Sequence, residues 1–273
     1  MKRPLAIAVL AKNKEHILPT YLNALLLQTE VNSDTLFYIR TNDNRDQTDE
    51  VLRDWYKKWN WKYKMVFDDS SIDTSLLGID NHDWNGHRCK ILAEIRQKSI
   101  DFAISENADY FVADCDNLIS PETITQLRST GLPVVAPLLQ CAVETSMYSN
   151  FHTDVDINGY FKQDDIGLYN NLLYQRIKGL VDLKVVHCTY YIKNSVLPQI
   201  VYDDDTYRYE YVMFSDNLRK KGIPQYLDTR KVYGRISFSV DQPSFDEELT
   251  NNPTFKDFVE YINKSTPKRW QIR

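Results

Sequence analysis

The stretch YFVADCDNLIS, residues 110–120, decides the fold because it places two carboxylates at the end of an apolar run. The apolar residues 110–112 are typical of a buried β-strand, and Asp114 and Asp116 follow where that strand should end. Two carboxylates at one spot repel each other unless a cation or a proton lies between them. The stretch therefore admits two interpretations, a divalent metal site or an ordinary turn built from Asp and Asn.

Strand-like and helix-like segments alternate on the N-terminal side of this stretch and just beyond it. The strand-like segments are 4–11, 35–43, 62–69, 109–116 and 132–139. Between them lie the helix-like segments 16–28, 47–59, 88–106 and 120–129, in which apolar residues recur at helical spacing. This order predicts the α/β class, with a doubly wound, mostly parallel sheet over residues 1–140.

The alternation stops after residue 140. Residues 141–185 carry polar and aromatic clusters and predict a loop-rich or antiparallel lobe. Strand-like segments follow at 184–193 and 223–236, with a helix-like segment at 209–222 between them, and the tail is expected to hold one helix over 254–265. We expect one domain over residues 1–240, made of a nucleotide-binding half (1–140) and a mixed acceptor-side half (141–240). Residues 241–273 are expected to form a helical tail that packs on this domain or extends from it.

Composition excludes several classes of protein. The 273 residues carry a net charge of −5, which argues against a general nucleic-acid binder. The four cysteines form no C-x-x-C pair, so a thiolate zinc site is not expected. The apolar run at the N-terminus is cut short by Lys12 and Lys14, and no run approaches the roughly 18 apolar residues of a membrane helix. These features predict a cytoplasmic chain with no signal peptide, no membrane segment and no nucleic-acid partner; they leave the oligomeric state open.

The position of the two aspartates favours a ligand site over a plain turn. Ligands bind beyond the carboxyl ends of the strands in an open α/β sheet. Alternation along an extended segment would point Asp114 and Asp116 the same way and Cys115 the opposite way. A hard divalent ion would bind both carboxylates and bridge to a diphosphate. No glycine-rich phosphate loop is present, so this combination fits a sugar-nucleotide transferase of the GT-A type.

Several stretches, in order, resemble the N-terminal glycosyltransferase domain of the procollagen galactosyltransferases over roughly residues 4–240. They are LAKNKEHILPTYLNAL (10–25), RTNDNRDQT (40–48), the segment 88–124 that holds the D-x-D, GLPVVAPLL (131–139), YSNFHTDVDINGYF (148–161) and RIKGLVDLKVVHCTYYIK (176–193). The resemblance implies Mn²⁺, a UDP-galactose donor and a hydroxylysine acceptor in a collagen-like protein. It also implies an inverting reaction.

The expected metal ligands are Asp114, Asp116 and Asp228. The family carries a His shortly before the Tyr-Gly of its last strand, and Lys231 stands at that place here. Asp228 is therefore a candidate substitute ligand, and water is the alternative at that position. The other interpretation of Asp228 is a residue of a turn at the end of a strand.

Candidate donor contacts follow the first two strands. Ala11, Asn13 and Lys14 lie where GT-A folds seat the nucleotide, although Lys14 also suits a solvated helix start. Asp43 is a candidate partner for the uracil or ribose, and an Asx turn is its alternative.

Four later residues complete the expected donor site. Arg88 and Lys90 begin a helix and are candidates for the diphosphate, with a solvated surface as the alternative for Lys90. Asn150 is expected to shape the sugar pocket. His187 follows a buried strand and is either a contact of the substrates or a histidine satisfied within the core.

An inverting transfer needs a carboxylate base near the acceptor hydroxyl. The family has an Asp-Asp pair before its late helix, and Tyr209-Glu210 stands there in this chain. Glu210 is thus the first candidate base and Asp205 the second, although residues 203–205 also suit a solvated acidic loop. Two rival functions stay open: a transferase with UDP-glucose or another acceptor, and a non-catalytic module that binds sugar-nucleotide or collagen-like peptide.

Overall fold

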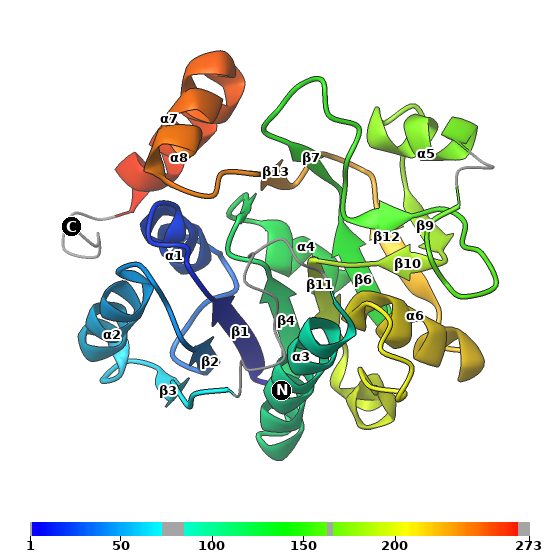
Figure 1. Ribbon diagram of the computed structural model, residues 1–273, viewed down its shortest axis with the longest axis horizontal. Coiled ribbons are helices and arrows are strands. Elements are labelled where there is room, and N and C mark those ends of the chain that lie inside the picture. The colour runs from blue at the N-terminus through cyan, green and yellow to red at the C-terminus, as the bar shows by residue number, and fades with distance from the viewer. Residues whose placement is uncertain (1, 73–84, 163–165, 267–273) are drawn as a thin grey trace.

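Strands and helices alternate through the first half of the computed structural model, which describes residues 2–72, 85–162 and 166–266 (Figure 1). The strands are β1 (Leu5–Ala11), β2 (Thr35–Thr41), β3 (Lys64–Asp68), β4 (Asp109–Ala113), β5 (Asn117–Ile119), β6 (Val134–Pro137), β7 (Leu139–Cys141), β8 (Phe151–His152), β9 (Leu180–Leu183), β10 (Val185–Val186), β11 (Thr189–Ile192), β12 (Gln225–Asp228) and β13 (Gly234–Ile236). The helices are α1 (Leu18–Leu26), α2 (Thr48–Trp59), α3 (Gly86–Ser105), α4 (Thr123–Ser129), α5 (Ile166–Leu173), α6 (Glu210–Lys220), α7 (Gln242–Asn251) and α8 (Pro253–Ser265), with a 3₁₀ helix η2 (Asn194–Gln199).

Eight of the strands form one mixed sheet in the order β3-β2-β1-β4-β11-β6-β12-β9. Strands β3, β2, β1 and β4 are parallel neighbours, and β12 is parallel to β6. Strand β11 runs antiparallel between β4 and β6, and β9 is an antiparallel edge strand. The predicted α/β class with a mainly parallel sheet is confirmed.

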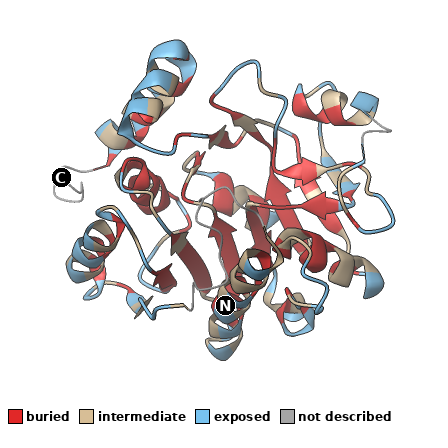
Figure 2. Cartoon of the chain, in the orientation of Figure 1, coloured by how far each residue is buried: buried red, intermediate tan, exposed pale blue. Residues whose placement is uncertain are grey.

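Side-chain alternation along the strands explains why helices cover both faces of the sheet. In β1, Leu5, Ile7 and Val9 belong to the apolar core shared with α1, α2 and α8. Ala6 and Ala8 point to the opposite core, where their small side chains face α3. Figure 2 shows the central strands buried and the outer faces of the helices exposed. Each large side chain buried in this way contributes about 1.5–3 kcal/mol, so both faces of the sheet stabilise the fold.

A small sheet of β5, β13 and β7 lies beside the end of β4. Strand β13 approaches β5 closely, because a Cβ at Gly234 would lie 2.1 Å from the carbonyl oxygen of Leu118. Only glycine fits at this position without moving the backbone. The close pairing fixes the chain that leaves the two aspartates.

The C-terminal segment holds two helices rather than the one expected. Asn252 ends α7 and caps α8 by accepting the N–H of Phe255, so the chain divides there. Phe245 and Phe255 join the core around α1. The division of the chain at residue 240 stays a prediction.

Candidate active site

The chain turns immediately after β4 instead of continuing as a strand. The N–H of Asn117 donates to the carbonyl of Asp114 at 2.8 Å, which closes the turn. The expected extended backbone is therefore wrong here, because residues 117–119 must leave β4 to pair with β13. Cys115 is buried as expected, and its thiol donates to the carbonyl of Leu10. The side chains of Asp114 and Asp116 are 29% and 27% exposed, so both reach solvent.

Each aspartate is paired with a cation from a different element. Lys14, just after β1, lies 2.9 Å from Asp116, and Arg96 of α3 lies 2.8 Å from Asp114. Burial opposes the charge of Lys14, but the Asp116 carboxylate raises its pKa above the ordinary value. The two carboxylates therefore sit between two fixed positive charges at the carboxyl edge of the sheet.

Glu210, the first residue of α6, extends this ion-pair network. Arg96 Nε lies 3.4 Å from Glu210 Oε1 while its Nη2 contacts Asp114. Burial raises the pKa of Glu210, although the Arg96 guanidinium pulls in the opposite direction. A carboxylate with a raised pKa is better suited to accept a proton near neutral pH than an ordinary glutamate.

Arg96 is the functional residue that our reading of the sequence missed. It lies on the core-facing side of α3, in the series Cys89, Ala93, Arg96, Ile100 and Ala103. The other members of that series are apolar, so a buried arginine among them needs a carboxylate partner. The signal was a cation on the apolar face of the helix that precedes the D-x-D.

The predicted donor residues after β1 and β2 form one loop cluster. Ala11 is the buried last residue of β1. Asn13 adopts a left-handed φ of 53°, donates its N–H to Asn44 and accepts the N–H of Arg45. Asn13 therefore ties the end of β1 to the loop after β2.

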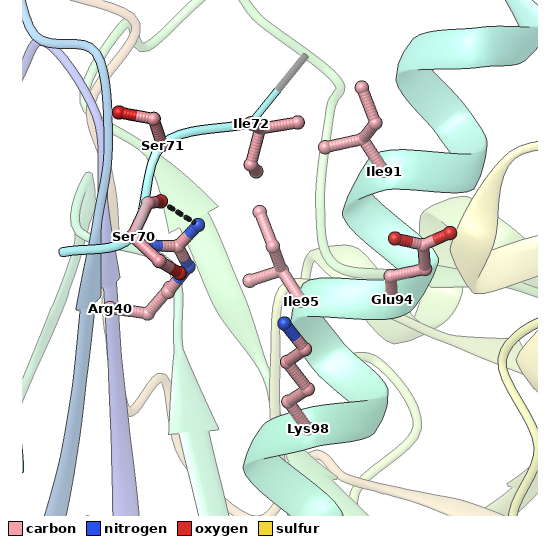
Figure 3. Close-up of a pocket in the computed structure, with 8 residues that line it drawn as sticks. All are labelled: Arg40, Ser70, Ser71, Ile72, Ile91, Glu94, Ile95 and Lys98. Atoms are coloured by element: carbon pink, nitrogen blue, oxygen red, sulfur yellow. Dashed lines mark hydrogen bonds between the residues drawn. The ribbon is translucent and has the colours of Figure 1, made fainter. Parts of the chain in front are cut away.

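A pocket lies between the ends of β2 and β3 and helix α3, and Asp43 is hydrogen-bonded to one of the residues that line it (Figure 3). Its carboxylate accepts the N–H of Ile72, which is one of the residues that line the pocket. The cavity measures about 340 Å³ and is lined by Arg40, Ser70, Ser71, Ile72, Ile91, Glu94, Ile95 and Lys98. In Figure 3, the isoleucines face one another across the cavity and the charged groups lie around it. The lining is mixed, with three isoleucines among five polar or charged residues, so it offers both apolar contact and hydrogen-bonding groups to a ligand.

The residues at the start of α3 have local partners. The side chain of Asn85 accepts the N–H of Arg88 and caps α3. Burial lowers the pKa of Lys12, and the nearby positive charge of Arg88 lowers it further. Lys90 lies 3.6 Å from Asp205 and 3.7 Å from Asp203. Asp205 is 91% exposed and its ion pair is with Lys90, whereas the two site aspartates pair with Lys14 and Arg96.

Asn150 and His187 are both buried beside the site. The Asn150 amide accepts the N–H of Leu139 and donates to the carbonyls of Pro137 and Thr189. These bonds show that the Asn150 side chain connects neighbouring strands through their backbones. Its amide is used in the fold, so the proposed site does not include the expected sugar contact.

His187 lies between Cys188 and two other rings. Its Nδ1 is 2.8 Å from the Cys188 thiol, and its Nε2 lacks a hydrogen-bond partner among the described residues. The rings of His152 and Tyr211 pack against it. Burial holds the pKa of His187 well below its usual range and lowers that of His152 to about 4, so both imidazoles are neutral.

The structure gives Asp228 partners other than a metal. Its carboxylate is fully buried, accepts two hydrogen bonds from Arg230 at 2.9 and 2.6 Å, and accepts the Tyr233 hydroxyl at 2.7 Å. Burial would raise the pKa of Asp228, but these donors hold it below the ordinary value. We therefore leave Asp228 out of the proposed metal site.

We expect Asp228→Asn to lower the free energy of unfolding by about 1–3 kcal/mol, because the substitution weakens charge-assisted bonds in a buried site. Because the folded-state pKa is depressed, this stability is present above the unfolded pKa and is lost as the pH falls through the folded pKa. Urea unfolding at neutral and acidic pH checks both points. A stable variant that has lost its response to Mn²⁺ would contradict this structural role.

Two carboxylates can hold a divalent ion only if other groups complete its shell. Within residues 2–72, 85–162 and 166–266, no group of three or more His, Cys, Asp or Glu side chains is placed to bind a metal. Hard cations in phosphate-transfer sites are often held by one or two carboxylates together with substrate oxygens and water. The partly exposed oxygens of Asp114 and Asp116 fit that arrangement, in which a bound diphosphate supplies further ligands.

Comparison with known proteins identifies related sequences. The family model described as glycosyltransferase family 25, N-terminal domain, matches residues 3–252. Human inactive glycosyltransferase 25 family member 3 is 30% identical over 188 residues, which are 67% of this chain and 31% of that protein. Human procollagen galactosyltransferase 2 is 27% identical over 243 residues, 84% of this chain and 38% of that protein. The chain thus spans about a third of the length of these curated relatives.

Solved structures with the same fold are glycosyltransferases. S. aureus TarS 1-349 in complex with UDP-GlcNAc has a TM-score of 0.54 at 13% identity, covering 98% of this chain and 72% of that chain. A Pyrobaculum calidifontis mannosyltransferase in complex with GDP-Man and Mn²⁺ has a TM-score of 0.50 at 10% identity, covering 99% and 72%. At such low identities the likeness shows the fold alone, which is of the GT-A type.

The prediction of a cytoplasmic location is contradicted by these comparisons. Relatives from zebrafish and human are named for galactosyl transfer to procollagen, and procollagen is a precursor made in the secretory pathway. The prediction rested on the low net charge and on the lysines that interrupt the first apolar run. Neither feature carries information about the compartment in which a partner is found. Among the described helices, none is both long and apolar enough to span a bilayer.

Proposed function

The chain belongs to glycosyltransferase family 25, and from this premise we propose that it is a metal-dependent, inverting transferase. The proposed reaction moves galactose from UDP-galactose to hydroxylysine in a collagen-like protein. One observation carries the proposal: Asp114 and Asp116 stand at the carboxyl edge of the sheet between the cations Lys14 and Arg96. The names of the procollagen galactosyltransferase relatives support the sugar and the acceptor.

The residues present have distinct roles in this proposal. Asp114 and Asp116 hold Mn²⁺, which when bound supplies Lewis-acid stabilisation of the UDP leaving group. Lys14 is placed to offset negative charge on the diphosphate. The cavity beside Asp43 receives the nucleoside, whose ring packs between the isoleucines. In this arrangement residues 1–140 bind the nucleotide, residues 141–240 serve the acceptor, and the tail 241–273 extends the fold.

Glu210 is the proposed base. The bond between the anomeric carbon and the UDP oxygen breaks as the acceptor oxygen attacks that carbon, and the hydroxyl proton passes to a carboxylate oxygen of Glu210. Arg96 holds Glu210 and Asp114 together and is therefore a positioning residue. Its two ion pairs couple the metal side of the site to the proton-accepting side.

A second candidate function is donor binding without turnover. The human relative that is 30% identical to this chain is named inactive. In addition, the proposed base is only 7% exposed and is already paired with Arg96, which would suit a purely structural role. In this candidate function the chain binds the donor but does not transfer its sugar.

UDP release from a panel of UDP-sugars separates the two candidates. We expect release from UDP-galactose that requires Mn²⁺, stops with a chelator and rises when a hydroxylysine-containing collagen-like peptide is added. A preference for UDP-glucose would replace galactose as the proposed donor sugar and leave the rest of the proposal unchanged. Measurable UDP binding with no release from any donor would favour the non-catalytic candidate.

A further inference from the structure

Two large aromatic rings stand exposed beside the site and have no role in the proposed chemistry. Tyr148 lies in the loop between β7 and β8 and is 40% exposed, and Phe238 follows β13 and is 49% exposed. Their ring centroids are 5.2 Å apart and the planes meet at 65°. The pair therefore forms one edge-to-face surface built from two segments far apart in the sequence.

Backbone hydrogen bonds connect this pair to both site aspartates. The N–H of Asp114 donates to the carbonyl of Cys188 at 2.9 Å, and the Cys188 sulfur lies 3.7 Å from the Tyr148 hydroxyl oxygen. On the other side, the N–H of Ser237 donates to the carbonyl of Asp116 at 2.9 Å, and Phe238 is the next residue. The aromatic pair therefore comes from segments that are held against the backbone of both site aspartates.

Two further exposed apolar side chains lie close to the two rings in the sequence. Met147 is 41% exposed and Val240 is 57% exposed, and with Tyr148 and Phe238 they make up what we call the aromatic patch. Large exposed apolar side chains gathered next to a polar site mark a binding surface. Asp241, the exposed carboxylate that caps α7, adds negative charge at its border.

Exposed aromatic rings close to a carboxylate suit an extended peptide that carries a cation. A single collagen-like chain adopts the polyproline II conformation, which is preformed and loses little entropy on binding. Grooves lined by aromatic side chains are the usual receptors for such chains, because proline rings pack on aromatic rings. A lysine-derived side chain is attracted by the exposed carboxylate of Asp241.

We propose that the aromatic patch binds the acceptor as a single polyproline II chain and directs its hydroxylysine toward Glu210. This inference rests on the proposed function and names the surface that recognises the acceptor. It assigns Tyr148 and Phe238 to acceptor specificity and gives them no part in donor binding.

The test compares transfer to peptide with hydrolysis of the donor by water. The probe is a single-chain peptide of Gly-Pro-hydroxylysine repeats, assayed with UDP-galactose and Mn²⁺. We expect Tyr148→Ala and Phe238→Ala each to raise the KM for the peptide about tenfold, as central aromatic contacts do, and to leave peptide-independent UDP release unchanged. Tyr148→Phe keeps the ring and is expected to behave as the wild type.

A matched control is Tyr261→Ala, which removes an equally exposed tyrosine from α8, outside the patch. We expect no change in the peptide KM for this variant. Peptide binding measured by calorimetry gives a second readout that does not depend on turnover.

Each outcome decides a different point. Equal losses of donor hydrolysis and peptide transfer in the Ala variants would overturn the inference and assign the rings to the donor sugar. An unchanged peptide KM, or equal affinity for a scrambled peptide without proline, would also overturn it. If the wild-type chain releases no UDP but binds the peptide through the patch, the proposed transferase function is wrong. The inference that the patch binds the peptide would still hold.

Discussion

Asp114→Asn and Asp116→Asn are each expected to reduce UDP-galactose-dependent transfer by about two to three orders of magnitude. Each substitution keeps the shape of the side chain but removes one of the two negative charges proposed to hold the metal. Losing an interaction that stabilises the charge of the leaving group has effects of this size. Initial rates of UDP release across a range of Mn²⁺ concentrations measure the loss.

The two variants should differ in stability although they agree in activity. Asp114 neutralises Arg96, whose side chain is only 10% exposed, whereas Asp116 neutralises Lys14, whose side chain is 25% exposed. In Asp114→Asn the more buried cation keeps only its longer ion pair with Glu210, at 3.4 Å. Weakening the pairing of a buried cation is the more expensive change, so we expect Asp114→Asn to lose about 1–2 kcal/mol more than Asp116→Asn. Asp101→Asn on the exposed side of α3 is the matched control and should change neither property. A double Asp114→Asn/Asp116→Asn variant with wild-type transfer would remove the metal site from the proposal.

The order of strands and helices in the first half of the chain could be predicted from the sequence because the signals there are local. The apolar run before Asp114 and the amphipathic pattern of 88–106 both depend on near neighbours, and both elements form as predicted. The position of β11, antiparallel between β4 and β6, could not be predicted from such local signals. Strand pairing between residues 110–113 and 189–192 is decided by the tertiary fold.

The partners of individual site residues also could not be predicted from the sequence. The pairing of Asp228 with Arg230 and Tyr233 depends on a turn that brings the partly exposed Arg230 and the buried Tyr233 onto the Asp228 carboxylate. The same limit applies to Asn150, whose backbone partners come from two separate segments, residues 137–139 and Thr189. A residue type in a motif therefore indicates chemistry, whereas its availability for that chemistry depends on its neighbours in space.

Arg96→Met is expected to be among the most destabilising substitutions in the site. It leaves Glu210, a 7% exposed carboxylate, without its cation, and removes the partner of Asp114 as well. Removing one member of a buried ion pair costs about 3–5 kcal/mol, because the other charge stays desolvated. The loss is measured by urea unfolding, with Arg53→Met as the matched control because Arg53 forms its ion pairs at an exposed surface.

The pH dependence of that loss identifies Glu210 as the group responsible. Burial already raises the pKa of Glu210, and removing Arg96 removes the positive charge that opposes this effect. A carboxyl group with a raised folded-state pKa contributes stability below its unfolded pKa, and that stability is lost as the pH rises through the folded pKa. The Arg96→Met variant should therefore be closest to the wild type near about pH 4–5 and fall further behind it toward about pH 8.

Adding Glu210→Gln to Arg96→Met should recover much of the loss at the higher pH, because a neutral amide has no charge to desolvate. The recovery would show that the two residues are coupled and that Arg96 compensates a buried negative charge. The double variant should still transfer no sugar, since it lacks the proposed base. If instead Arg96→Met were equally destabilised at both pH values with and without Glu210→Gln, the cost would come from lost packing around α3. Glu210 would then be neutral in the folded protein, and a base that is already protonated cannot accept the proton of the acceptor hydroxyl.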